Sequence, residues 1–118
     1  MFWLLAVVVV CVGSVLPAST LHSLHYDRLA PNDKLVHFLG YTTLALIPVV
    51  LLEVAGLGVA LAAGMIPLGI VLEFLQRLIP GRGFEAADMV ANTCGVATGI
   101  VAALFLRRIV SSRAPANP

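Results

Sequence analysis

The chain has 118 residues, of which 60% are hydrophobic and 11% charged, with a formal net charge of +1. Soluble domains carry about a quarter charged residues, so this composition excludes an ordinary soluble domain and indicates an integral membrane protein. No basic run or aromatic-basic interleaving is present, and we therefore expect no nucleic-acid partner. Cys11 and Cys94 both lie in apolar runs, where cysteine packs as a small side chain.

The first predicted helix covers residues 2–16, an apolar run that ends at Pro17. It is at the short end of what crosses a bilayer, where about 20 residues are usual. Cleavage as a signal peptide is one interpretation, but no Lys or Arg precedes the run as a signal peptide requires. We therefore expect a retained transmembrane helix, with Phe2 and Trp3 at the headgroup level.

Residues 17–32 form a predicted polar loop, which is longer than an ordinary connection. Its spaced leucines and histidines fit an amphipathic segment at the membrane interface. His22 and His25 also have a metal-ligand spacing, but two imidazoles on a loop are a weak signal. We predict no metal and no cofactor.

The second predicted helix covers residues 33–54, with Asn32 as its cap. Asp33, His37 and Tyr41 follow one another at intervals of four residues, which places them on one face of this helix. Further along, a proline at position 48 frees a backbone carbonyl that a neighbouring helix must cover.

The third predicted helix covers residues 59–79 and carries Pro67 near its middle. Three polar side chains share one face near its far end, where lipid exposure would be costly: Glu73, Gln76 and Arg77.

The fourth predicted helix covers residues 85–109, after a turn that contains Arg82. Asp88 and Asn92 are one helical turn apart at its beginning. A row of small residues adjoins them and predicts close approach by another helix: Ala91, Gly95, Gly99 and Ala103. We expect residues 111–118 to be a disordered tail.

The sequence thus predicts an all-α protein, an integral membrane four-helix bundle forming a single domain over residues 1–118. The polar segments converge at one membrane face. The second and fourth helices both begin there, so the positive ends of their dipoles point into the cluster. Arginine and lysine donors beside helix N-termini suit a phosphate or carboxylate. The predicted pocket consists of Asp33, Lys34, His37, Tyr41, Glu73, Gln76, Arg77, Arg82, Asp88 and Asn92. Alternatively, these acids and bases only neutralise one another between helices.

Membrane orientation depends on the distribution of basic residues, which is close to even between the two faces. Because Arg77 and Arg82 are expected to be engaged within the fold, we expect the C-terminus to be cytoplasmic and the pocket to face outward.

Three motifs occur in order: DKLVHFLGY at 33–41, EFLQRLIPGR at 73–82, and Asp88 and Asn92 followed by spaced glycines. Together they resemble the VanZ-like family of small polytopic bacterial membrane proteins, over roughly residues 30 to 100. One named family member is associated with teicoplanin resistance. The resemblance implies a bacterial cytoplasmic membrane protein that handles an envelope lipid or a lipophilic glycopeptide, and it supplies no mechanism.

Three functions remain open. The first is binding of membrane lipids, through an anionic envelope-lipid headgroup or a lipid-linked cell-envelope precursor, or binding of a lipophilic glycopeptide. The second is an intramembrane transferase or hydrolase acting on a lipid-linked, phosphate-containing substrate, with His37 as general base; no nucleophile is marked in the sequence. The third is a structural assembly partner.

Overall fold

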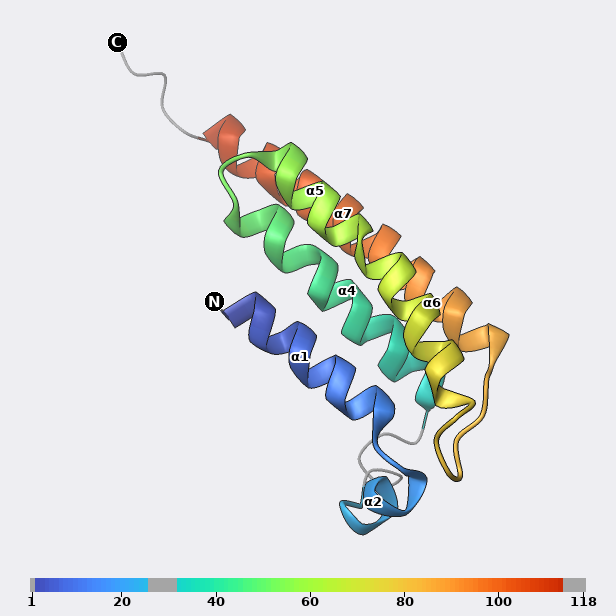
Figure 1. The fold of residues 1–118 in the computed structure, drawn as a ribbon. Coiled ribbons are helices and arrows are strands. Elements are labelled where there is room, and N and C mark those ends of the chain that lie inside the picture. The colour runs from blue at the N-terminus through green and yellow to red at the C-terminus, as the bar shows by residue number, and fades with distance from the viewer. Residues whose placement is uncertain (1, 26–31, 114–118) are drawn as a thin grey trace.

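The computed structural model describes residues 2–25 and 32–113, and this part of the chain forms helices joined by turns, without strands (Figure 1). The helices are α1 (Phe2–Val15), α2 (Ala18–Ser23), α4 (Asp33–Leu51), α5 (Ala55–Ala63), α6 (Met65–Gln76) and α7 (Ala86–Arg113). Since α5 and α6 follow one another as a single interrupted helix, the long elements form a four-helix bundle. The predicted fold class is confirmed.

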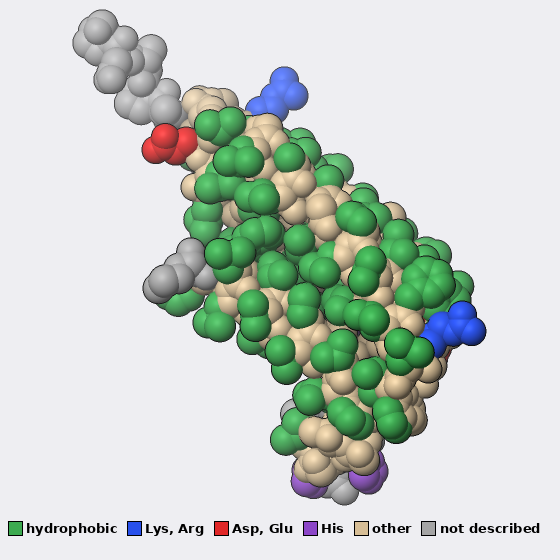
Figure 2. Space-filling model, viewed as in Figure 1, with side chains coloured by type: hydrophobic (Ala, Val, Ile, Leu, Met, Phe, Trp, Pro, Cys, Tyr) green, Lys and Arg blue, Asp and Glu red, His purple; other side chains and the backbone are tan. Residues whose placement is uncertain are grey.

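Three helical spans are long and apolar enough to cross a membrane: Asp33–Leu51, Ala55–Gln76 and Ala86–Ser112. The shorter α1 is also apolar and lies along α4 (Figure 1). Hydrophobic side chains cover the flank of the bundle, whereas the charged and histidine side chains in view lie near its ends or edge (Figure 2). This distribution is typical of a multi-pass membrane protein.

Several boundaries differ from those predicted. Within the predicted loop 17–32, α2 forms a short helix, and residues 26–31 lie outside the described part. The second and third helices end three residues early, at Leu51 and Gln76, whereas α7 continues to Arg113, inside the segment predicted as a disordered tail. After α6, three backbone N–H groups donate to the carbonyl three residues earlier, as in a 3₁₀ turn. Pro80 follows, and a proline disfavours the helical conformation in the residue before it. Residues 114–118 also lie outside the described part.

The interruption between α5 and α6 lies at Gly64, where the sequence predicted an unbroken helix. Pro67 is the third residue of α6. A backbone N–H in the first helical turn has no intrahelical acceptor, so a proline is tolerated there but not in a helix interior. Starting a new helix at Met65 is therefore compatible with Pro67, and the two segments still continue across the bundle.

The helices α4 and α7 form the most extensive pair in the bundle. A Cβ atom added to Gly95 would lie 2.4 Å from the Phe38 carbonyl oxygen, and one added to Gly99 would lie 2.4 Å from that of Thr42. Neither position has room for a side chain. The predicted close approach over the small-residue row is thus confirmed.

Pro48 leaves the carbonyl of Leu44 without its intrahelical donor, because that donor would be the N–H four residues on. The Trp3 indole Nε1–H donates to the Leu44 oxygen at 2.7 Å. Trp3 therefore lies about 10 Å from the Leu51 end of α4, at 1.5 Å per residue, and its indole N–H pairs with the backbone of α4. The structure identifies α1 as the helix that covers the freed carbonyl.

Both ends of α4 have polar caps. At its start, Asn32 Oδ1 accepts the Leu35 N–H at 3.1 Å, which confirms the predicted cap. At its other end, the Arg107 guanidinium of α7 donates to the carbonyl oxygens of Val49 at 2.8 Å and Glu53 at 2.9 Å. A cation at a helix C-terminus also complements the helix dipole.

Replacement of Gly95 by alanine should force α4 and α7 apart and destabilise the protein by about 1–3 kcal/mol. Thermal unfolding of the purified protein in detergent micelles measures this. The control is Gly40→Ala, also within a helix, where an added Cβ meets nothing within 4 Å. Equal melting temperatures for the two variants would contradict the packing argument.

Replacement of Trp3 by phenylalanine keeps an aromatic ring but removes the donor to Leu44, and should cost about 1 kcal/mol. In a Pro48→Ala background the new N–H at position 48 can bond to that carbonyl, so the same change should cost less. A double-mutant cycle of unfolding free energies measures the coupling. Strictly additive costs would show that Trp3 does not serve the freed carbonyl.

Candidate functional site

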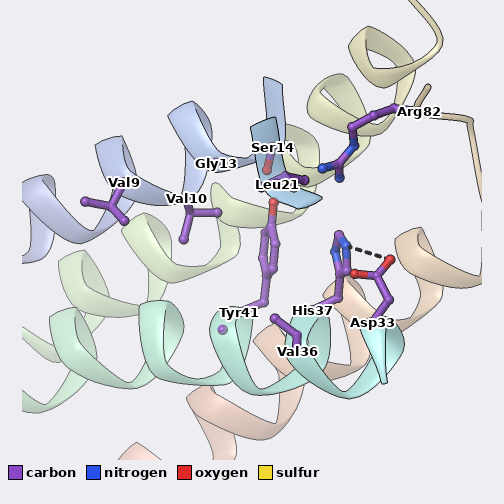
Figure 3. A pocket seen from close by; sticks show the side chains of 11 residues that line it. Val9, Val10, Gly13, Ser14, Leu21, Asp33, Val36, His37, Tyr41 and Arg82 are labelled. Carbon is purple, nitrogen blue, oxygen red and sulfur yellow. Dashed lines mark ion pairs between the residues drawn. The ribbon is translucent and has the colours of Figure 1, made fainter. Parts of the chain in front are cut away.

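A cavity of about 350 Å³ opens between α1, α2, α4 and the turn that follows α6 (Figure 3). His37 and Tyr41 project into it from α4, and Arg82 reaches toward it from the turn. Its lining residues are Val9, Val10, Gly13, Ser14, Leu21, Asp33, Val36, His37, Gly40, Tyr41 and Arg82. The charged groups gather at one end, whereas α1 contributes mostly apolar and small residues.

His37 lies at the centre of the polar end. Its Nε2 atom is 3.8 Å from Asp33 Oδ2 and 3.8 Å from Asp88 Oδ2, and its Nδ1 atom is 2.9 Å from Asn92 Oδ1. An amide oxygen only accepts hydrogen bonds, so Nδ1 carries the proton and donates to Asn92. The ring is mostly buried, and its Nε2 atom faces two carboxylates.

Lys34 lies on the outer side of this cluster. Its ammonium donates a hydrogen bond to Glu85 Oε2 and forms an ion pair with Asp88 Oδ1 at 3.1 Å. The hydrogen bond from Lys34 holds the pKa of the Glu85 carboxyl below its usual range. The lysine is thus already shared between two acids of the protein.

Glu73 and Gln76 are buried but bind the backbone. Glu73 Oε1 accepts the Glu85 N–H at 2.7 Å, just ahead of α7, and Gln76 Nε2 donates to the Ser14 carbonyl at 3.1 Å. These contacts fasten the end of α6 to the beginning of α7 and to the end of α1. Both side chains therefore hold the frame of the cavity, and neither lines it.

The two arginines of this region differ in position. Arg77 is exposed, with its guanidinium carbon 5.9 Å from the centre of the Phe84 ring, on the outer surface of the hairpin. Arg82 is half-buried and lines the cavity. Among the described residues, Arg82 is the one Lys or Arg that lines the cavity.

Of the ten residues predicted for the pocket, four line the cavity, namely Asp33, His37, Tyr41 and Arg82. Asp88 and Asn92 contact His37, and Lys34 contacts Asp88. Glu73 and Gln76 bind the backbone around the cavity, and Arg77 lies outside it. Sequence reasoning missed the wall contributed by α1 and α2, and also Glu85. Gly13 and Ser14, which interrupt an otherwise bulky apolar run, were the available signal for that wall.

One trio can offer ligand atoms to a metal ion. Asp33, His37 and Asp88 each place one such atom within 4.8 Å of the others. The sequence prediction of no metal considered His22 and His25, whereas this trio combines residues from α4 and α7. Asp88 joins the other two only through the packing of α7 against α4, which the spacing of residues in the sequence does not show.

No protein-family model, no curated protein and no solved structure matches this chain. The fold and the cavity define its class. It is a multi-pass, all-helical membrane protein with an amphipathic cavity at one end of the bundle.

Proposed function

We propose that this protein binds an amphiphile with an anionic headgroup, either an envelope lipid or lipid-linked precursor or a lipophilic glycopeptide. On this proposal it acts as a VanZ-like protein of the bacterial cytoplasmic membrane and contributes to glycopeptide (teicoplanin) tolerance. The observation that carries the proposal is the cavity itself, which joins a charged end to an apolar wall. A ligand with a polar head and a hydrocarbon chain matches that division.

The size and position of the cavity support this. Ligand pockets typically measure about 300–1,000 Å³, so 350 Å³ accommodates a headgroup and the adjoining part of a chain. Val9, Val10 and Gly13 of α1 provide the apolar wall. At the other end, Arg82 supplies a planar fork of donors that suits a phosphate or carboxylate.

An outward-facing cavity fits the handling of envelope precursors and glycopeptides, and we keep that orientation as part of the proposal. The positions of the basic residues provide little support for this orientation. Arg77 is exposed and not engaged within the fold as expected, whereas Arg107 is engaged as the cap of α4. Neither arginine therefore supports the sequence argument for orientation.

A second candidate is an intramembrane transferase or hydrolase acting on a lipid-linked phosphate. The observation in its favour is His37, whose Nδ1–H is held by Asn92 while Nε2 lies beside the cavity, as a positioned general base requires. Turnover of a lipid-linked substrate by wild type, lost in His37→Ala, would favour this candidate. Binding without turnover in wild type would favour the first.

Replacement of Arg82 by alanine should reduce retention of anionic lipid by roughly 10- to 100-fold, since a charge-assisted hydrogen bond contributes roughly 1.5–3 kcal/mol. Native mass spectrometry of the protein in vesicles of phosphatidylglycerol and phosphatidylcholine measures retention. The matched control is Arg77→Ala, which removes an equal charge outside the cavity. Equal losses in both variants, or none in either, would contradict the proposal.

Replacement of Gly13 by leucine should fill the apolar end of the cavity and displace the chain of a bound lipid. An added Cβ at Gly13 meets nothing within 4 Å, so the fold should tolerate the change. Lipid occupancy should fall severalfold, whereas the control Gly56→Leu, equally open but remote from the cavity, should keep it. Unchanged occupancy in Gly13→Leu would place the lipid elsewhere.

A further inference from the structure

The polar end of the cavity contains groups that accept hydrogen bonds and face one another. Because Asn92 holds the proton of His37 on Nδ1, a neutral ring presents a lone pair at Nε2. That atom lies 3.8 Å from a carboxylate oxygen of Asp33 and 3.8 Å from one of Asp88. Ionised carboxylates also only accept, so a neutral ring has no proton at Nε2 to donate to them. A cation satisfies all of them at once.

Asp88 gives a second and independent observation. It is 3% exposed, and its Oδ1 atom is the buried side-chain atom that lacks a hydrogen-bond partner among the described residues. The nearby Lys34 ammonium is also committed to Glu85. A buried carboxylate with one shared ion pair and no hydrogen bond at Oδ1 is incompletely stabilised, and coordination of a metal can complete its stabilisation.

The side chains around the cavity carry an excess of carboxylates, which also favours a bound cation. Four carboxylates lie within the cluster and its frame, and they belong to Asp33, Glu73, Glu85 and Asp88. Two cations accompany them, Lys34 and Arg82. The carboxylates thus outnumber the Lys and Arg side chains by two, which favours a bound cation at this end of the cavity.

We propose that Asp33, His37 and Asp88 bind a divalent transition-metal ion, of the zinc or manganese type, at the polar end of the cavity. One imidazole with two carboxylates is a borderline ligand set that suits these ions better than calcium, which takes oxygen ligands. Ligands at about 2.1 Å from one ion are at most about 4.2 Å apart, so the two separations of 3.8 Å already fall within range.

Asn92 is the positioning residue of this site. Metal-binding histidines almost always donate their second ring N–H to an oxygen acceptor, which fixes the tautomer and the direction of the ring. The 2.9 Å contact between His37 Nδ1 and Asn92 Oδ1 provides this. Three protein ligands leave coordination positions open, as in metal sites that also bind a substrate or water. Binding of a lipid phosphate at such an open position rests on the proposed function, whereas binding of the metal itself does not.

The test uses the full chain, purified in detergent, stripped with chelator and titrated with zinc chloride or manganese chloride alone. Isothermal titration calorimetry and elemental analysis after dialysis should show one equivalent per chain. Asp33→Asn, His37→Ala and Asp88→Asn should each weaken binding at least a hundredfold. Asn92→Ala should weaken it about 10–100-fold.

The controls are His22→Ala on α2 and Glu53→Gln just past the Leu51 end of α4, which remove an imidazole and a carboxylate outside the cluster and should bind as wild type does. Asp33 is 45% exposed at the side chain, so its variant should fold even where a buried replacement fails. Stoichiometry below a tenth of an equivalent, or equal losses in trio and control variants, would overturn the inference. Metal binding in a protein that retains no lipid would refute only the proposed function.

Discussion

The approach of α4 to α7 is the contact on which the rest of the structure depends. Gly95 and Gly99 allow the backbone of α4 to lie directly against α7, with no side chain between them. That distance brings Asn92 of α7 to 2.9 Å from His37 of α4, and Asp88 to 3.8 Å from the same ring. A wider separation would leave these groups buried without one another. Packing of the smallest residues therefore assembles the most polar part of the molecule.

In an apolar bundle, a polar side chain is explained structurally when it serves a backbone group that would otherwise lack a partner. Trp3, Gln76 and Arg107 all donate to carbonyls, and Glu73 accepts a backbone N–H. These four residues need no ligand to account for them. His37 Nε2 and Asp88 Oδ1 have no such hydrogen-bonded partner among the described residues. The structural and functional interpretations of the cluster thus apply to different members of it.

Much of the fold could be predicted from the sequence, because apolar runs, the Asn32 cap and the small-residue row each have a local physical meaning. The ends of helices were less predictable. The interruption at Gly64 depends on whether a bundle can accommodate Pro67 by starting a new helix, which is a tertiary question. Among the site residues, spacing placed Glu73 and Arg77 on one helix face but could not show that one turns to the backbone and the other to the surface.

The sequence suggested an anion site because three cations, Lys34, Arg77 and Arg82, were expected to meet there. Packing changes this balance, since Lys34 is shared by two acids and Arg77 lies against Phe84 outside the cavity. With Arg82 as its one Lys or Arg among the described residues and an excess of carboxylates nearby, the cavity alone would bind an anionic headgroup weakly. Acceptance of such a ligand requires added positive charge at the polar end, and a divalent ion among the acids provides it. Affinity for an anionic amphiphile and affinity for a metal are then coupled, each raising the other by the same factor.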